Sequence, residues 1–151
     1  MFLCLEHLRI KNSGIVYHDL AGSFPFMLLD RSICFLILYH YNLNCILASP
    51  IAGLNDKSIF AAYEKMFKEL ESKGFKPKLN VMDNQALKHI KQFLTKNECR
   101  LQLVEPHNHH VNATECAIQT FKDAFIVALA MLDSNFSLQL WDKIIPYVQL
   151  R

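Results

Sequence analysis

The apolar residues of this 151-residue chain follow a strand-like pattern up to residue 50 and a mostly helical one afterwards, and this change limits the folds that the chain can adopt. Residues 14–20, 32–40 and 44–50 are rich in β-branched and aromatic side chains, which favour strands. The short polar break at residues 41–43 is typical of a hairpin. These runs predict three antiparallel strands in a meander.

From residue 55 onward, predicted helices alternate with short strands. Asn55 or Asp56 is placed to cap the N-terminus of a first helix, and Gly74 is placed to end it. Between them, apolar residues recur at helical spacing: Ile59, Ala62, Tyr63, Met66, Phe67 and Leu70.

The remaining elements complete an alternating order. Strands are predicted at residues 78–83 and 101–104, and helices at residues 86–96, 113–132 and 133–151. The short helix should turn four apolar residues inward: Leu87, Ile90, Phe93 and Leu94. Up to residue 132 the order is β-β-β-α-β-α-β-α, which predicts an α/β fold with a mixed five-stranded sheet and helices on both faces.

Composition excludes several classes of protein. With 52% hydrophobic and 20% charged residues, the chain is typical of one globular domain, and its net charge of +2 gives no strong overall attraction to nucleic acid. None of the five cysteines is spaced as C-x-x-C, which argues against a disulfide framework or a cysteine-based zinc module. We expect no membrane span and no signal peptide, because the apolar runs are short and Glu6 and His7 interrupt the first of them.

Three acids occur where this topology would bring them together. Asp19 lies in the first predicted strand, Asp83 ends the fourth, and Glu115 lies in the first turn of the long helix after the fifth. Clustered carboxylates repel one another, and bound Mg²⁺ relieves that repulsion through oxygen ligands. Two such ions about 3.5–4 Å apart would clamp both oxygens of a phosphoryl displacement. The alternative is that these acids are ordinary solvated surface residues.

The long helix carries a polar stripe and an apolar one. The polar stripe has i, i+3, i+4, i+7 spacing and consists of Glu115, Ile118, Gln119 and Lys122. The apolar stripe should face the core and consists of Ala117, Phe121, Ala124, Phe125, Ala128 and Met131. Gln119 and Lys122 are placed to reach phosphate oxygens beyond a metal-bound Glu115. A solvated helix face is the simpler alternative.

Three blocks of sequence resemble the acid-bearing blocks of integrase catalytic cores from long-terminal-repeat retrotransposons. They are Y-H-D-L-A-G-S-F-P, V-M-D-N-Q and P-H-N-H-H-V-N-A-T-E-C-A-I-Q-T-F-K, and the later L-W-D-K-I-I-P resembles the helix after the core in those proteins. The resemblance implies a ribonuclease-H-like fold and a polynucleotidyl transferase that processes 3′ ends of element DNA and joins them to target DNA. It implies that Asp19, Asp83 and Glu115 are the catalytic residues and hold two Mg²⁺ or Mn²⁺ ions.

Further expectations follow from the same resemblance. Six residues are expected to contact DNA: Asn84, His107, His109, Asn112, Gln119 and Lys122. Self-association into a homo-oligomer and action in the nucleus are also implied. The core would span residues 14–132, preceded by an irregular extension at 1–13 and followed by a C-terminal helix at 133–151 that starts a linker.

Two other functions and one other site remain open. Gln85 follows Asp83-Asn84, where the family often has an acid or glycine, and the chain resembles a fragment of something longer; a degenerate or domesticated copy would then bind DNA or protein without catalysis. A metal-dependent nuclease of the same fold would cut DNA without joining it. The histidine-rich segment 107–110 could bind zinc together with Cys99 and Cys116, although the spacing fits no common zinc pattern. His18 should point to the opposite face from Asp19 and be structural.

Overall fold

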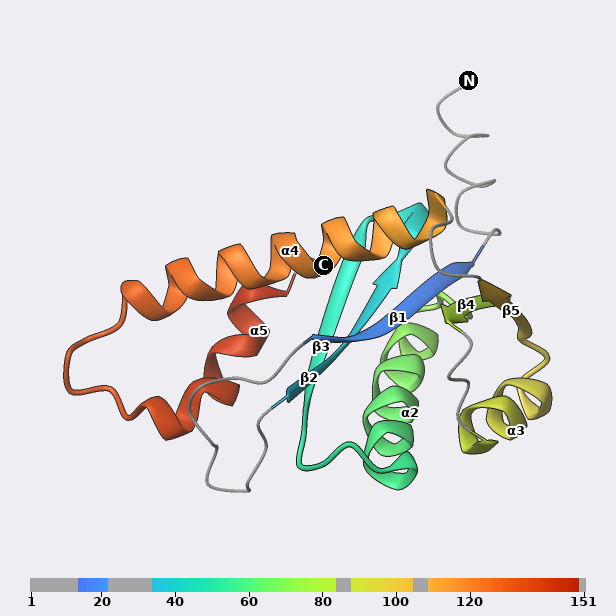
Figure 1. Ribbon diagram of the computed structural model, residues 1–151, viewed down its shortest axis with the longest axis horizontal. Helices are drawn as coiled ribbons and strands as arrows, with labels where there is room; N and C mark the ends of the chain where they lie inside the picture. Colours follow the sequence, from blue (N-terminus) through green and yellow to red (C-terminus); the bar gives the residue numbers. More distant parts are fainter. Residues whose placement is uncertain (1–13, 22–33, 84–87, 105–108, 150–151) are drawn as a thin grey trace.

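The structure, a computed structural model, describes residues 14–21, 34–83, 88–104 and 109–149, with only the backbone for Asp83 and residues 109–114 (Figure 1). Its strands form one five-stranded sheet in the order β3-β2-β1-β4-β5. The strands are β1 (Ile15–Ala21), β2 (Cys34–His40), β3 (Cys45–Ile51), β4 (Leu79–Asp83) and β5 (Arg100–Val104). β1, β2 and β3 pair antiparallel, whereas β4 pairs parallel with both β1 and β5. The predicted mixed sheet is confirmed.

The hairpin between β2 and β3 turns through a single 3₁₀ turn, η1 (Tyr41–Leu43). His40 is buried at 2% exposure, and its Nδ1 accepts a hydrogen bond from the Leu43 backbone N–H at 3.3 Å. Asn44 ends the turn in the left-handed region, with φ of 50°. Burial lowers the pKa of His40, because desolvation penalises the charged imidazolium.

A dependence of stability on pH follows from His40. The unfolded chain binds a proton at His40 near pH 6.5, whereas the folded chain binds it only at lower pH, so stability is lost as pH falls below about 6.5. The urea midpoint of the wild-type protein should therefore be lower at pH 5.5 than at pH 7.5. This fall should be smaller in His40→Asn, whose side chain does not titrate but can still accept the hydrogen bond from the Leu43 N–H. An equal fall in both proteins would contradict this prediction.

The first helix, α2 (Asp56–Ser72), forms as its sequence predicts. Its N-cap is Asn55, whose side-chain oxygen accepts from the Ser58 N–H at 2.9 Å. All six predicted inward residues are buried: Ile59, Ala62, Tyr63, Met66, Phe67 and Leu70. Gly74 has φ of 83°, and the N–H groups of Gly74 and Phe75 donate to the carbonyls of Glu71 and Leu70, which closes the helix in a Schellman motif.

Helices cover both faces of the sheet, as predicted. α2 and α3 (Lys88–Lys96) pack on one face around residues such as Val16, Leu36 and Leu47. The long α4 (His109–Ala130) and the shorter η2 (Leu138–Ile144) and α5 (Ile145–Val148) pack on the other, around Phe35 and Ile37 (Figure 1). We refer to these as the α2 face and the α4 face. No helix in the described part of the chain is long and apolar enough to cross a membrane.

The segment after α4 is not the single helix predicted for residues 133–151. Asp133 starts a turn instead, accepting from Asn135 N–H through its side chain and from Phe136 N–H through its backbone. The 3₁₀ turns of η2 then kink at Leu140 and continue into α5, where Pro146 has no N–H to extend the ladder. The apolar residues of this segment nevertheless enter the core: Trp141, Ile144, Ile145 and Val148.

A buried polar cluster joins β1, β4 and α2 on the α2 face. Asn80 is fully buried, and its side-chain oxygen accepts from the Tyr63 hydroxyl at 3.1 Å and lies 3.1 Å from Nδ1 of His18. The rings of His18 and Tyr63 also pack with centroids 4.8 Å apart. His18 is therefore structural and points away from the face of Asp19, as predicted.

Candidate active site

The register between β1 and β4 brings two of the predicted catalytic acids to the same level. Tyr17 pairs with Val81, an offset of 64 residues, and Asp19 and Asp83 are separated by the same 64 residues. The pairing itself ends at Tyr17 and Val81; extended by two residues, the same register would set Asp19 level with Asp83 on the neighbouring parallel strand. Both acids lie toward the carboxyl ends of their strands, the edge where open α/β sheets commonly bind ligands.

Strand alternation places Asp19 on the α4 face. Tyr17 lies in a buried cluster on that face, and the side chain two residues further along β1 points the same way. The Ala21 side chain confirms the alternation for β1, since it packs in the core under α4. Asp19 is exposed, and its Oδ1 accepts from the Leu20 N–H at 2.7 Å, which fixes the orientation of the carboxylate.

The third acid, Glu115, lies on α4, which packs against the same face. Glu115, Gln119 and Lys122 are all exposed, as the polar stripe predicts. Gln119 Nε2 donates to Asp123 Oδ1 at 2.6 Å, so this amide is oriented along the helix surface. Lys122 makes no ion pair with any side chain that the structure describes.

Two residues of the predicted stripes on α4 were assigned to the wrong side. Ile118 is buried at 9% exposure within the core cluster, although it was placed on the polar stripe. Met131 is 82% exposed, although it was placed on the apolar stripe. Near Ala117 and Ile118, a wide part of the α4 surface contacts the core, so Ile118 is buried although it lies outside the predicted apolar stripe. Met131 follows the last residue of α4, so the helical spacing no longer determines which side it faces.

The start of α4 also differs from the prediction. The helix begins at His109, four residues before the predicted start, so His109 and Asn112 belong to a helix rather than a loop, and Glu115 lies in its second turn. No glycine or proline occurs between His107 and Leu132 to stop the helix from extending. The side chains of His109 and Asn112, and all of Asn84 and His107, lie outside the described residues.

The donor set fits a hard divalent cation. Asp19, Asp83 and Glu115 offer carboxylate oxygens only, which Mg²⁺ and Mn²⁺ prefer. Among the side chains that the structure describes, no three His, Cys, Asp or Glu residues lie close enough to hold a metal ion, and the Asp83 carboxyl is not one of those side chains. What the structure shows of this candidate metal site is the backbone position of the three acids, on β1, β4 and α4.

The alternative zinc site loses one of its candidate ligands. Cys99 is buried at 5% exposure in the core of the α2 face, whereas Cys116 is exposed on α4, on the other side of the sheet. Burial raises the pKa of the Cys99 thiol to about 11, so the thiolate that zinc requires is disfavoured. Cys99 and Cys116 therefore cannot serve one zinc ion in this fold.

Sequence reasoning missed a group of three tyrosines that come from β1, β2 and η1. The rings of Tyr17, Tyr39 and Tyr41 lie with centroids 6.1–6.4 Å apart, and Tyr41 is 51% exposed. The Tyr39 hydroxyl donates to Asn44 Oδ1 at 3.1 Å. Burial, and then the neighbouring Tyr41, raise the pKa of Tyr17 and Tyr39, so both stay protonated at neutral pH. Alternation along Y-H-D and L-Y-H-Y is the signal that places Tyr17 and Tyr39 on the face of Asp19.

Comparison with known proteins gives matches of structure only. No family model matches the sequence, and no curated protein matches it. The catalytic core domain of BIV integrase superposes with a TM-score of 0.69 at 10% identity, over 91% of this chain and 81% of that one. The HTLV-2 integrase catalytic core domain in complex with magnesium, in a trimeric form, gives 0.68 at 13% identity, over 90% and 82%.

A third match comes from a larger assembly, a simian T-cell lymphotropic virus intasome in complex with PP2A regulatory subunit B56 gamma. Its TM-score is 0.69 at 11% identity, over 89% of this chain and 47% of that one. These likenesses show that the chain has the fold of retroviral integrase catalytic core domains, so the predicted ribonuclease-H-like fold is confirmed.

Proposed function

We propose that this chain is the catalytic core of a retrotransposon integrase, a metal-dependent polynucleotidyl transferase that joins DNA ends to a target. The observation that carries the proposal is the 64-residue offset shared by the β1–β4 register and by the pair Asp19 and Asp83. Glu115 comes to the same face on α4. The fold of integrase catalytic cores supports it, and one of the similar structures is a magnesium complex.

In this proposal the three carboxylates hold Mg²⁺ or Mn²⁺. When bound, such ions supply the charge that activates the attacking oxygen and stabilises the leaving oxygen in an in-line displacement. The chain itself positions the DNA. Lys122 contacts a phosphate as a point charge, and Gln119 contacts a second phosphate oxygen from the preceding turn of α4.

The remaining proposed contacts come from residues next to the acids in sequence. Asn84 follows Asp83, and His107, His109 and Asn112 precede Glu115, so each would touch DNA beside the reacting phosphate. DNA would be both substrate and target, and a homo-oligomer would hold the two together. An element-DNA substrate places the action in the nucleus.

A strand-transfer assay tests the proposal. The protein, incubated with Mn²⁺, a short duplex that carries the element end and a plasmid target, should give joined products. Glu115→Gln should lose them, because the amide keeps the shape of the side chain and removes its charge. Asp133→Asn, a matched exchange on an exposed acid beyond the far end of α4, should keep them.

The products also separate the alternatives. Cutting without joining would identify a nuclease of the same fold and refute strand transfer. DNA binding with neither cutting nor joining would identify a binding module that has lost catalysis. Joined products in Glu115→Gln at the wild-type level would remove Glu115 from the metal site.

A further inference from the structure

Positive charge is concentrated in about a fifth of the chain. Residues 73–104 contain two acids, Asp83 and Glu98, and seven cations: Lys73, Lys76, Lys78, Lys88, Lys91, Lys96 and Arg100. Their formal net charge is therefore +5, whereas the whole chain has +2 and the rest of it −3. The net charge of the whole chain does not reveal this concentration of positive charge in residues 73–104. Such a concentration indicates an anionic partner.

The fold gathers several of these cations at one edge of the sheet. The Arg100 N–H donates to the Lys78 carbonyl at 2.9 Å, and Lys78 immediately precedes β4 while Arg100 starts the neighbouring parallel strand β5. Lys76 and Arg100 both lie close enough to the Cys99 thiol to lower its pKa, although burial dominates and raises it. These cations therefore lie at the amino ends of β4 and β5, the opposite end of the sheet from Asp19 and Asp83.

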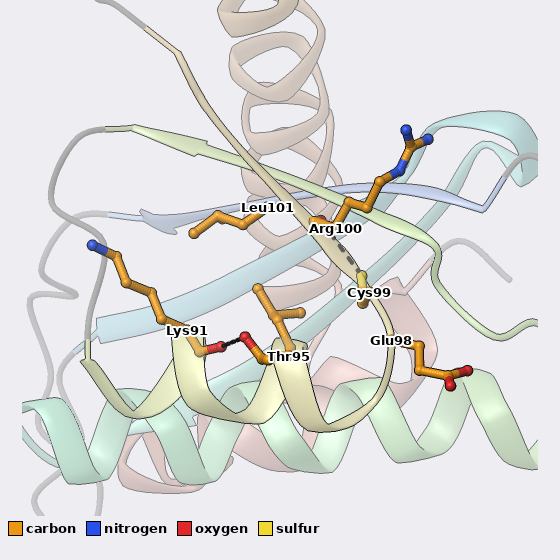
Figure 2. Close-up of a pocket in the computed structure, with 7 residues that line it drawn as sticks. Lys91, Thr95, Glu98, Cys99, Arg100 and Leu101 are labelled. Carbon is orange, nitrogen blue, oxygen red and sulfur yellow. Dashed lines mark hydrogen bonds between the residues drawn. The ribbon is translucent and has the colours of Figure 1, made fainter.

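An open hollow of about 660 Å³ lies beside this edge, between α3 and β5 (Figure 2). Figure 2 shows Lys91 extending from α3 and Arg100 from the start of β5, with Leu101 between them. Buried Leu94 also lines the hollow. Glu98 lines the hollow as well, so the hollow combines an apolar floor with two cations and one carboxylate, and none of these three side chains is in an ion pair with another described side chain.

The nearby acids do not neutralise these cations. Glu64 and Glu69 are paired with Lys68 and Lys73, each at 2.7 Å, on α2. Among the described side chains, no ion pair involves Lys91 or Arg100, nor any of Lys76, Lys78 and Lys96. Unpaired like charges held close together repel one another, and a polyanion laid across them would relieve that repulsion.

We infer that the surface formed by Lys76, Lys78, Lys91 and Arg100, which we call the basic edge, binds the phosphate backbone of duplex DNA away from the reacting bond. The inference rests on the proposed function, which makes DNA the polyanion that this chain meets. The open shape of the hollow and the spread of cations over α3 and two strand ends suit a repeating row of phosphates. The basic edge holds DNA in position and takes no part in the chemistry.

Salt-dependent binding tests the inference. The affinity for a fluorescent 30-base-pair duplex is measured by anisotropy in EDTA between 50 and 300 mM salt, so that bound metal plays no part. The double variant Lys91→Gln/Arg100→Gln loses two phosphate contacts, so its log–log salt slope should fall by about 1.8 and its affinity at 100 mM salt by up to about 60-fold. The control double variant Lys65→Gln/Lys143→Gln also removes two exposed cations, Lys65 on α2 and Lys143 in η2, where it is paired with Asp142, and it should keep the wild-type slope.

The possible outcomes are distinct. If both double variants lost the same affinity and salt slope, the effect would come from net charge alone and the inference would be overturned. An unchanged salt slope in Lys91→Gln/Arg100→Gln would also overturn it. Competition by poly-glutamate as strong as by DNA would identify an acidic protein partner instead and overturn it too. A loss confined to the Lys91/Arg100 variant supports the basic edge even if the strand-transfer assay fails, so the two proposals can fall separately.

Discussion

Asp83→Asn is expected to remove the stabilisation that Mn²⁺ gives the fold. A ligand that binds only the native state adds RT ln(1 + [L]/Kd) to the free energy of unfolding, about 2.7 kcal/mol at a hundredfold excess over Kd. The wild-type protein should therefore melt at a higher temperature with Mn²⁺ than in EDTA. Asp83→Asn loses a carboxylate ligand and should show little or no difference between the two conditions.

Without metal, Asp83→Asn should not lower the stability of the fold. The β1–β4 register, extended two residues beyond Tyr17 and Val81, sets Asp83 level with Asp19, and two carboxylates held close together repel one another. Removing one charge should leave the metal-free Asp83→Asn protein at least as stable as the wild-type protein. Thermal melts of both proteins, with and without Mn²⁺, separate this pattern from general damage to the fold.

Asp133→Asn provides the control for these melts. Its side chain is exposed in the turn after α4, and asparagine can still accept the hydrogen bond from Asn135, so its Mn²⁺ shift should equal that of the wild-type protein. A full Mn²⁺ shift in Asp83→Asn would place the metal elsewhere, and the histidines that precede Glu115 would be the next ligands to test.

The elements that could be predicted from the sequence are those in which several local signals agree. α2 has an N-cap at Asn55, six inward residues at helical spacing and a C-terminal Gly74, and the structure confirms each of them. The strand order depends on the change of period at residue 55 and on the rule that βαβ units pair parallel strands. Agreement among independent signals makes these elements predictable.

The incorrect predictions concern segments in which contacts with distant residues decide between two structures that the local sequence allows. Ile118 and Met131 were misplaced because sheet contact buries a wider part of α4 near its start than near its end. The segment after α4 has an amphipathic pattern but also turn-forming residues from Asp133 to Asn135 and a late Pro146, and the turns prevailed. Nothing local predicts that Asn80, a polar residue within a strand, is fully buried, because its partners Tyr63 and His18 come from distant segments.

The candidate site was more predictable than its surroundings. The position of Asp19 relative to Asp83 depends on the register between β1 and β4. This register is strongly specified because hydrophobic residues alternate along the strands and one face of the sheet is buried. Glu115 was placed on the correct exposed side of α4 despite the error in where the helix starts. The tyrosine group and the basic edge were missed, because each is assembled from segments whose proximity only the fold reveals.

Phe121→Ala should destabilise the protein by about 3–5 kcal/mol, the usual cost of truncating a buried aromatic residue. Phe121 is 2% exposed and packs edge-on against Phe35, with ring centroids 5.3 Å apart, and stacks with Phe125 at 5.8 Å. The alanine would leave a cavity between α4 and the sheet. Trp141, the single tryptophan of the chain, is buried against Phe35, so its fluorescence in a urea titration reports the unfolding directly.

The adjacent residue gives the matched comparison, because Lys122 is exposed on the stripe of Glu115. Lys122→Ala should change stability by no more than about 0.5 kcal/mol, as surface substitutions usually do. It should instead weaken DNA binding about equally for all sequences and lower the salt slope by roughly one unit, as expected for one lost phosphate contact. If Lys122→Ala unfolded the protein while Phe121→Ala left it stable, α4 would be rotated in solution. Glu115 would then point away from Asp19 and Asp83, and the metal site proposed for these three acids would lose its third ligand.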